Sequence, residues 1–204
     1  MNININTFNK WADLGKDKSM AKNHEDSVNK MFDIIKQKGF LFSKPFNFID
    51  IGCGNGWVVR KILDYKNCNY ALGIDGAKNM IKIANTYNKG TFLEEDIGNF
   101  KFKKKFDIVF SMETFYYLSN IDLILKDIYN NGLDEHGILI IGIDHYKENT
   151  PSLNWGNDYN LDIKTLSIDE WRKKMSINKF KNINLFQFNK KDDWQGTLII
   201  SCTK

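Results

Sequence analysis

The 204-residue sequence contains few cysteines and no long apolar run, and each shortage excludes a class of protein. Its three cysteines are odd in number and lack the spacing of a disulfide framework or a zinc site, which is typical of a reducing cytoplasm. No apolar run approaches the length of a membrane span, and the first residues lack the basic and apolar regions of a secretion signal. The sequence therefore predicts a cytoplasmic protein without a membrane segment, and its length suits a single domain.

Arginine is also scarce, and the scarcity bears on the partner. Arg60 and Arg172 are the only arginines, so the net charge of +4 comes almost entirely from lysine. Bidentate recognition of phosphate and guanine favours arginine, so a nucleic-acid partner is not expected. No cluster of histidine, cysteine and aspartate has metal-ligand spacing, so the sequence predicts no metal site.

The most informative segment is a glycine-rich turn. A short apolar run ends at Asp50, Gly52, Gly54 and Gly56 follow at alternate positions, and an amphipathic stretch occupies residues 57–63. This order predicts a strand, a tight turn and a helix start, where glycine permits positive φ and the close approach of a ligand. The spacing differs from the G-x-G-x-x-G of a dinucleotide site. A carboxylate at this position suits a ligand with an ammonium group better than a pyrophosphate.

Later segments repeat the pattern of an apolar run followed by a polar turn. Residues 68–75 predict a second strand that ends in Asp75, which lies 19 positions after Gly56. A nucleoside-binding α/β unit places a carboxylate on ribose hydroxyls at about this distance. Further strands are predicted at residues 90–97, 106–111 and 137–143, with helices at 77–87 and 120–130.

The order of these motifs resembles that of the class I S-adenosylmethionine-dependent methyltransferases, closely so over residues 45–145. The resemblance implies an α/β fold with a doubly wound, seven-stranded Rossmann-like sheet, mostly parallel with an antiparallel C-terminal strand, and an N-terminal helical cap. It implies S-adenosylmethionine as cofactor, with Asp50 near its methionine amino group and Asp96 and Ile97 at its adenine. The cofactor-binding residues that it implies are Asp50, Gly52, Cys53, Gly54, Asp75, Gly76, Asp96, Ile97, Ser111 and Met112.

The segments around the core have distinct expected roles within the single domain 1–204. They are a helical cap at residues 1–44, a cofactor-binding core at 45–145, a lid at 146–166, and a helix with two strands at 167–204. The expected lid is polar, irregular and long for a connection, and such segments at the edge of an α/β sheet are usually lids or binding loops. The last helix begins with a capping box at residues 167–170, and the two strands are expected at 183–188 and 195–202.

The acceptor site is expected at the carboxyl ends of the fourth and fifth strands. Methyl transfer from a sulfonium is an in-line displacement, so the protein mainly positions the acceptor, and a base is needed only for a protonated amine or a weakly acidic hydroxyl. His145 is the predicted base, because it follows a strand end and histidine titrates near neutral pH. Glu113 is the second candidate, and Tyr116 and Tyr117 are expected to shape the acceptor pocket as further catalytic residues.

Two residues of the N-terminal cap have open assignments. Trp11 and His24 either line the mouth of the site or are, respectively, a packing residue and a surface residue. For the whole chain, the sequence favours methyl transfer to nitrogen or oxygen of a small molecule. A basic face beside the pocket would instead favour an RNA or protein methyltransferase, and a pocket closed to any acceptor would favour a non-catalytic S-adenosylmethionine-binding protein. A nicotinamide oxidoreductase is disfavoured by the third glycine and by the C-terminal strands.

Overall fold

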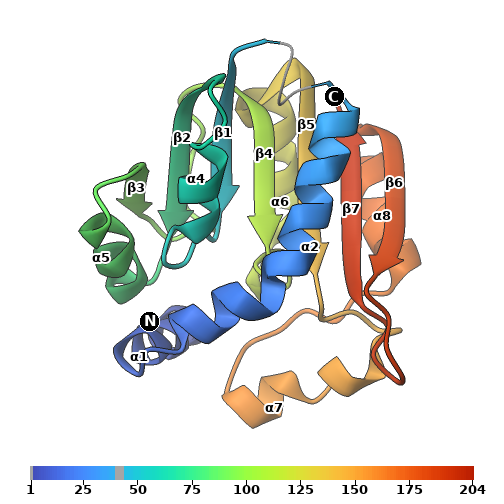
Figure 1. The fold of residues 1–204 in the computed structure, drawn as a ribbon. Helices are drawn as coiled ribbons and strands as arrows, with labels where there is room; N and C mark the ends of the chain where they lie inside the picture. Colours follow the sequence, from blue (N-terminus) through green and yellow to red (C-terminus); the bar gives the residue numbers. More distant parts are fainter. Residues whose placement is uncertain (1, 40–43) are drawn as a thin grey trace.

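A seven-stranded sheet organises the computed structural model, which describes residues 2–39 and 44–204 (Figure 1). The strands are β1 Phe46–Ile51, β2 Cys68–Asp75, β3 Thr91–Glu94, β4 Phe106–Met112, β5 Leu133–Ile143, β6 Lys181–Phe188 and β7 Thr197–Thr203. Their order in the sheet is β3-β2-β1-β4-β5-β7-β6. Strand β7 is antiparallel to both of its neighbours, whereas β3, β2, β1, β4 and β5 pair in parallel. The predicted doubly wound, Rossmann-like sheet with an antiparallel C-terminal strand is thereby confirmed.

Helices cover both faces of this sheet (Figure 1). They are α1 Ile3–Asp13, α2 Asp17–Gln37, α4 Trp57–Ile62, α5 Lys78–Thr86, α6 Ile121–Asp127, α7 Trp155–Tyr159 and α8 Ile168–Ile177. Short turns complete the described elements: the 3-10 turns η1 Phe115–Tyr117 and η3 Thr150–Ser152, and the π-helical turn η2 Ile128–Gly132. The expected cap contains α1 and α2, and residues 1 and 40–43 of it lie outside the described residues.

Side chains that alternate along each strand divide the apolar core between the two faces of the sheet. In β1, Phe48 packs with α2 and α4 on one face, whereas Ile49 packs with α6 and α8 on the other. Both side chains are fully buried. Successive side chains of a strand point to opposite faces, so a strand covered on both sides needs a nearly continuous apolar run. Helix α2 contributes Val28, Phe32 and Ile35 to the first of these two cores.

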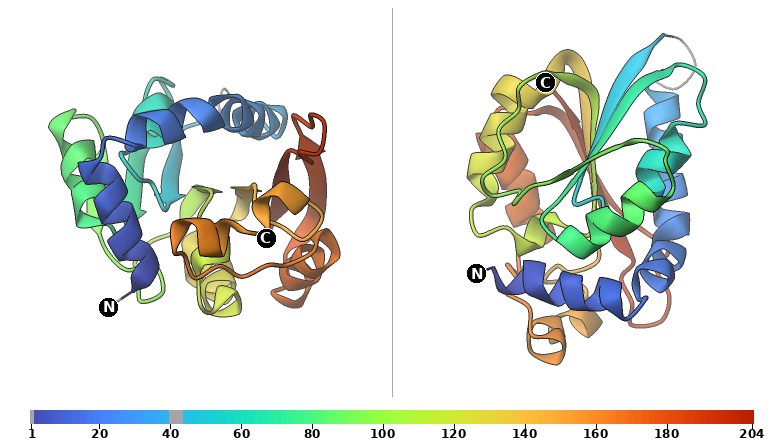
Figure 2. Two further views of the ribbon diagram at one scale, coloured as in Figure 1. Left: turned by 90° about the horizontal axis from the view of Figure 1, so that it is seen from below. Right: turned by 90° about the vertical axis from the view of Figure 1, so that its left-hand side faces the viewer.

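The parallel strands deliver their carboxyl ends to one edge of the sheet. Helices α1 and α7 lie at this edge, as the view from below shows (Figure 1; Figure 2, left). Helix α1 begins at Ile3, because the Asn2 side chain accepts hydrogen bonds from the backbone N–H groups of Asn4 and Ile5. Among the described residues, every helix is too short or too polar to cross a lipid bilayer.

The end of strand β3 differs from the prediction, whereas the start of helix α8 agrees with it. Strand β3 ends at Glu94, earlier than expected, because the Asp96 side chain accepts a hydrogen bond from Gly98 N and forms a turn there. The predicted capping box of α8 is present, since Ser167 Oγ accepts from Glu170 N while the Glu170 carboxylate accepts from Ser167 N. Because β3 ends at Glu94, Asp96 lies in the turn after this strand, beyond the ladder of backbone hydrogen bonds and at the carboxyl edge of the sheet.

Candidate active site

A cleft opens at the carboxyl edge of the sheet, between the strand ends and helices α1 and α2. Its empty space, including the part open to solvent at its mouth, is about 980 Å³. Nine of the ten residues predicted to bind a cofactor line it, namely Asp50, Gly52, Cys53, Gly54, Asp75, Gly76, Asp96, Ile97 and Met112. Motifs separated along the sequence therefore meet at one site.

The glycine turn opens the floor of this cleft. Gly52 and Gly54 have φ values of +80° and +52°, a region that residues with a Cβ rarely occupy. A Cβ at Gly52 would lie 1.9 Å from the Thr114 hydroxyl oxygen, so packing requires glycine there. A Cβ at Gly54 would meet no atom within 4 Å, although Gly54 lines the cleft. The missing side chain of Gly54 thus leaves room for a ligand against the backbone.

Asp75 and Asp96 present oriented carboxylates to the same space. Asp75 Oδ2 accepts a hydrogen bond from Gly54 N at 2.9 Å, and Oδ1 accepts from Ala77 N at 2.7 Å. Burial raises the pKa of Asp75, and the two backbone hydrogen bonds partly oppose this effect. Each carboxylate oxygen keeps a lone pair for a further donor. This geometry suits the hydroxyl and amino groups of a nucleoside.

Asp50 is the most buried acid of the cleft, with an exposed fraction of 2%. Burial, followed by the charge of Asp75, raises the pKa of the Asp50 carboxyl well above its ordinary value. A cationic ligand group would offset both effects, as expected for an ammonium group. The neighbouring Cys53 is also buried, and burial raises the pKa of its thiol well above the ordinary value. Cys53 is therefore a neutral lining residue and not a nucleophile.

Ser111 and Tyr116 lie behind the cleft instead of lining it. Ser111 is fully buried, and its hydroxyl donates to the backbone oxygen of Ile51 at 2.7 Å, which ties β4 to β1. Tyr116 is also fully buried, and its hydroxyl donates to Glu113 Oε2 at 2.5 Å. Tyr117 does line the cleft, and its hydroxyl lies 3.2 Å from that of Tyr116. Of the two predicted tyrosines, the structure thus brings one to the site.

His145, the predicted base, is turned away from the cleft. Its exposed fraction is 1%, its Nδ1 lies 2.9 Å from Ser152 O, and its Nε2 lies 2.8 Å from Thr165 Oγ1. The ring packs between Tyr116 and Trp155, with centroid distances of 5.4 and 6.2 Å. Both nitrogens are engaged within the protein, so the position of His145 does not support the expected role.

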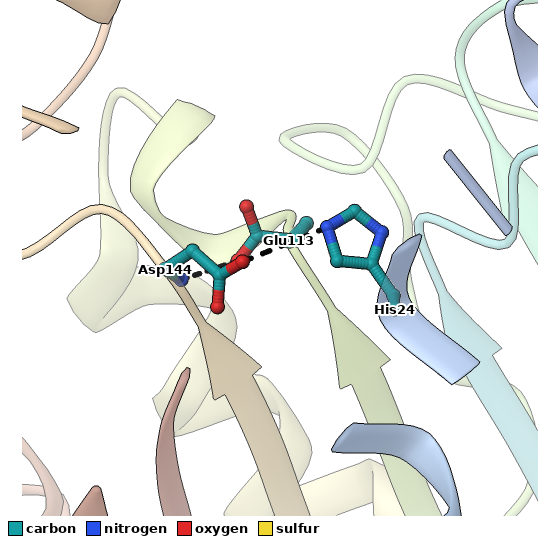
Figure 3. A group of neighbouring side chains, drawn as sticks. All are labelled: His24, Glu113 and Asp144. Carbon is teal, nitrogen blue, oxygen red and sulfur yellow. Dashed lines mark hydrogen bonds and ion pairs between the residues drawn. The ribbon is translucent and has the colours of Figure 1, made fainter. Parts of the chain in front are cut away.

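A different group of titratable side chains lies at the cleft, with His24 and Glu113 in its lining and Asp144 beside them, and we refer to these three residues as the acceptor cluster (Figure 3). They come from α2, the end of β4 and the end of β5, and their ligand atoms all lie within 4.8 Å of one another. His24 Nε2 lies 3.7 Å from Asp144 Oδ2, and Glu113 Oε1 accepts a hydrogen bond from Asp144 N. His24 and Glu113 line the cleft. The side-chain types are those of a metal site, although the sequence predicted none.

Burial sets the charge state of the acceptor cluster. It raises the pKa of Glu113 well above its ordinary value, and the charge of Asp144 adds to this. It also raises the pKa of Asp144, whereas His24 and Thr197 act in the opposite direction. The pKa of His24 is lowered, because burial outweighs the raising effects of Asp144 and of a backbone hydrogen bond with Met20. A cation placed between these groups would relieve the unfavourable burial of the two acids.

The segment expected as a lid, residues 146–166, contributes nothing to the described lining of the cleft. It packs against the start of α1, where the Asn4 side chain donates to Asp162 O at 2.9 Å and accepts from Asp162 N at 2.8 Å. Trp11 contacts Tyr159 with a centroid distance of 5.7 Å and is absent from the lining. Helices α1 and α2 form a wall of the cleft, and the segment supports the start of α1.

Comparisons with known proteins agree with this architecture. Residues 49–141 match the family model described as a methyltransferase domain. The malonyl-[acyl-carrier protein] O-methyltransferase of Calditerrivibrio nitroreducens is 31% identical over 159 residues, which are 76% of this chain and 60% of that protein. The enzyme of the same name from Bacillus cereus is 26% identical over 116 residues, which are 55% of this chain and 42% of that protein. The chain thus matches about half of the length of these curated relatives.

A solved structure extends the likeness to nearly the whole chain. One chain of the complex between the Haloferax volcanii Trm112 methyltransferase activator and a methyltransferase superposes with a TM-score of 0.78. The superposition covers 96% of both chains at 22% identity, which shows a shared fold. The sequence match, the fold and the nine converging residues agree with one another. Residues 49–141 thus match a methyltransferase domain, and the chain as a whole has the fold of the class I S-adenosylmethionine-dependent methyltransferases.

Proposed function

We propose that this chain binds S-adenosylmethionine in the cleft and transfers its methyl group to nitrogen or oxygen of a small molecule. The observation that carries the proposal is the open space over Gly54, next to the carboxylates of Asp50 and Asp75. A cofactor with an ammonium group, a ribose and an adenine needs acids of this kind and a backbone that it can approach closely.

The residues have distinct roles in this proposal. Asp50 binds the ammonium group, Asp75 the ribose hydroxyls, and Asp96 with the backbone of Ile97 the adenine. The bound cofactor supplies a methyl group that its sulfonium has already activated. The protein therefore has to hold the acceptor in line with that methyl and to exclude water. Helix α1 serves the second task, since Ile5 Cδ1 lies 2.6 Å from the position of a Cβ at Gly76 and thus closes the cleft over the cofactor residues.

The remaining part of the cleft favours a small acceptor. Beyond the cofactor residues its lining continues to Met20, His24, Glu113 and Tyr117, which leaves space for a second molecule. This space supports methyl transfer over mere retention of the cofactor. Among the described lining residues there is no lysine or arginine, so the cleft offers no basic path for an RNA backbone.

Calorimetry with S-adenosylhomocysteine tests the proposal on two matched variants. Gly54→Val places a branched side chain in the cleft, and Gly15→Val makes the same change at φ +67°, again with no atom within 4 Å but outside the lining. We expect Gly54→Val to weaken binding about 10- to 100-fold, from a cost of about 1–3 kcal/mol for overpacking. Gly15→Val should bind like the unchanged protein. Equal affinity of both folded variants contradicts the proposal.

A further inference from the structure

Acidic side chains line the cleft, and no lysine or arginine of the described lining accompanies them. The acids are Asp17, Asp50, Asp75, Asp96 and Glu113. An anionic acceptor would meet these carboxylates without a counter-charge, whereas a cationic acceptor would be attracted. The lining therefore selects against a carboxylate-bearing acceptor of the kind that the names of the malonyl-[acyl-carrier protein] relatives describe.

Three of these acids already have partners under the proposed function. Asp50, Asp75 and Asp96 serve the cofactor, and Asp17 Oδ2 accepts a hydrogen bond from the Asn55 side chain at 2.9 Å. Glu113 remains, and it lies in the acceptor cluster with His24 and Asp144. The acidic groups available to a second ligand are therefore concentrated at this cluster.

The hydrogen-bond donors around the acceptor cluster leave one buried carboxylate oxygen unpaired: Glu113 accepts from Tyr116 and from Asp144 N, and Thr197 bonds the Asp144 side chain, but Asp144 Oδ1 has no partner. Asp144 has an exposed fraction of 7%. Asp144 Oδ2 faces His24 Nε2 at 3.7 Å, too far for a direct hydrogen bond. A hydrogen bond between the Met20 backbone and the His24 ring raises the pKa of His24, as an acceptor does. Several acceptor atoms thus converge on a space that a donor-rich cation would satisfy.

Aromatic side chains border the same part of the cleft. Phe8 and Tyr117 both line it, and their rings contact each other edge to face with a centroid distance of 5.2 Å. Aromatic faces attract organic cations and provide an apolar surface for the carbon skeleton of an acceptor. A fixed divalent ion would also satisfy the acids, but it would keep its charge beside the sulfonium. An ammonium group can lose its charge by giving up a proton.

We propose that the acceptor is a small amine, an inference that rests on the proposed function. Its ammonium group is bound by Glu113 and Asp144 and gives a proton to His24. The neutral nitrogen then forms a bond to the methyl carbon, while the carbon–sulfur bond breaks and its electron pair stays on sulfur. The products are a methylated ammonium ion and the neutral thioether, and the proton on His24 passes to solvent. His24 acts as the base and Asp144 stabilises the imidazolium.

The test uses three probes of similar size and different charge, namely 2-phenylethylammonium, 2-phenylethanol and 3-phenylpropionate. Each is titrated by NMR into the unchanged protein saturated with S-adenosylhomocysteine, so the readout is binding and not turnover. We expect the ammonium probe to bind at least about tenfold more tightly than the alcohol, and the carboxylate probe to bind most weakly. Equal or tighter binding of the alcohol or the carboxylate overturns the inference, and so does the absence of binding by all three.

Variants locate the preference within the cleft. Glu113→Gln and Asp144→Asn should each reduce the ammonium-over-alcohol ratio about tenfold, whereas Asp17→Asn removes a charge elsewhere in the lining and should leave most of it. If all three variants reduce the ammonium-over-alcohol ratio equally, the assignment of the preference to the acceptor cluster is overturned. Tight binding of Mn²⁺ that is lost in both His24→Gln and Glu113→Gln overturns it in favour of a metal site. Failure to bind S-adenosylhomocysteine at all would contradict the proposed function, a result distinct from each of these.

Discussion

His24 Nε2 lies 3.7 Å from Asp144 Oδ2, although His24 belongs to helix α2 and Asp144 follows strand β5, 120 positions later in the sequence. The pair joins the helical cap to the carboxyl edge of the sheet. Burial lowers the pKa of His24 more than Asp144 and Met20 raise it. The ring is therefore neutral near neutral pH and can accept a proton.

Replacing Asp144 with a neutral residue should lower the pKa of His24. Asp144→Asn removes the charge that raises the pKa of His24, so burial acts with less opposition and the pKa falls further. A pH titration of the imidazole resonances by NMR measures the change directly. An unchanged or higher pKa of His24 in the variant would show that the acid does not act on the ring.

Cofactor affinity should depend on pH through Asp50. Its pKa is raised in the free protein, and only the ionised carboxylate attracts an ammonium group. Affinity should therefore fall as the pH drops through the raised pKa of Asp50, and cofactor binding should release a proton. Calorimetry in buffers of different ionisation enthalpy checks both points. Asp50→Asn should bind weakly and lose this part of the pH dependence.

The same shift has the opposite effect on stability. Between the ordinary and the raised pKa of Asp50, the folded state holds a proton that the unfolded state releases. The contribution of Asp50 to the free energy of unfolding therefore increases as the pH falls through this window. Denaturant unfolding of the unchanged protein and of Asp50→Asn isolates this contribution. A contribution that decreases with falling pH would mean that Asp50 is ionised and well paired in the free protein.

Ser111 should matter for stability and not for the cofactor. Ser111→Ala removes the hydroxyl that donates to Ile51 O at 2.7 Å between two central strands. The free energy of unfolding should fall by about 1 kcal/mol, the usual size of one buried hydrogen bond. Affinity for S-adenosylhomocysteine should stay unchanged. Loss of affinity with unchanged stability would restore Ser111 to the cofactor site that the sequence predicted.

Asn4 should couple α1 to the segment that supports it. Its side chain bonds both backbone groups of Asp162, so Asn4→Ala should speed hydrogen exchange in α1 and at the Asp162 amide. Asn2→Ala is the matched control, because the described hydrogen bonds of the Asn2 side chain go to the α1 backbone. It should speed exchange at the start of α1 alone. If both variants leave the Asp162 amide equally protected, other contacts hold the segment in place.

The cofactor half of the site was predictable because its signals are local. Asp50, Asp75 and Asp96 each follow an apolar run that reads as a strand, and parallel strands bring such ends to one edge. The glycine turn is equally local, since positive φ at Gly52 and Gly54 restricts the residue type. The order and spacing of these residues therefore predicted both the fold and nine of the lining residues.

The acceptor half was less predictable, because it depends on which way single residues turn. Asp144 and His145 are adjacent, and successive side chains of an extended chain point to opposite sides. A difference of one residue in the strand end decides which of the two faces the cleft. His24 comes from α2, whose rotation about its own axis is fixed by packing against the sheet. The apolar stripe of α2 indicates which face packs on the sheet, but no local pattern indicates how far the helix extends along the sheet, which decides whether His24 reaches the strand ends.

The central claim is that the cofactor occupies the cleft beside His24 and not beside His145. The chain has three histidines, so imidazole NMR spectra recorded while S-adenosylmethionine is added test this claim directly. His24 lines the cleft, His145 is buried with both nitrogens engaged, and His136 is exposed near the start of β5. We predict large shifts for His24 and small ones for the other two. Shifts that are largest at His145 or His136, or an unchanged His24 at saturation, would contradict the account.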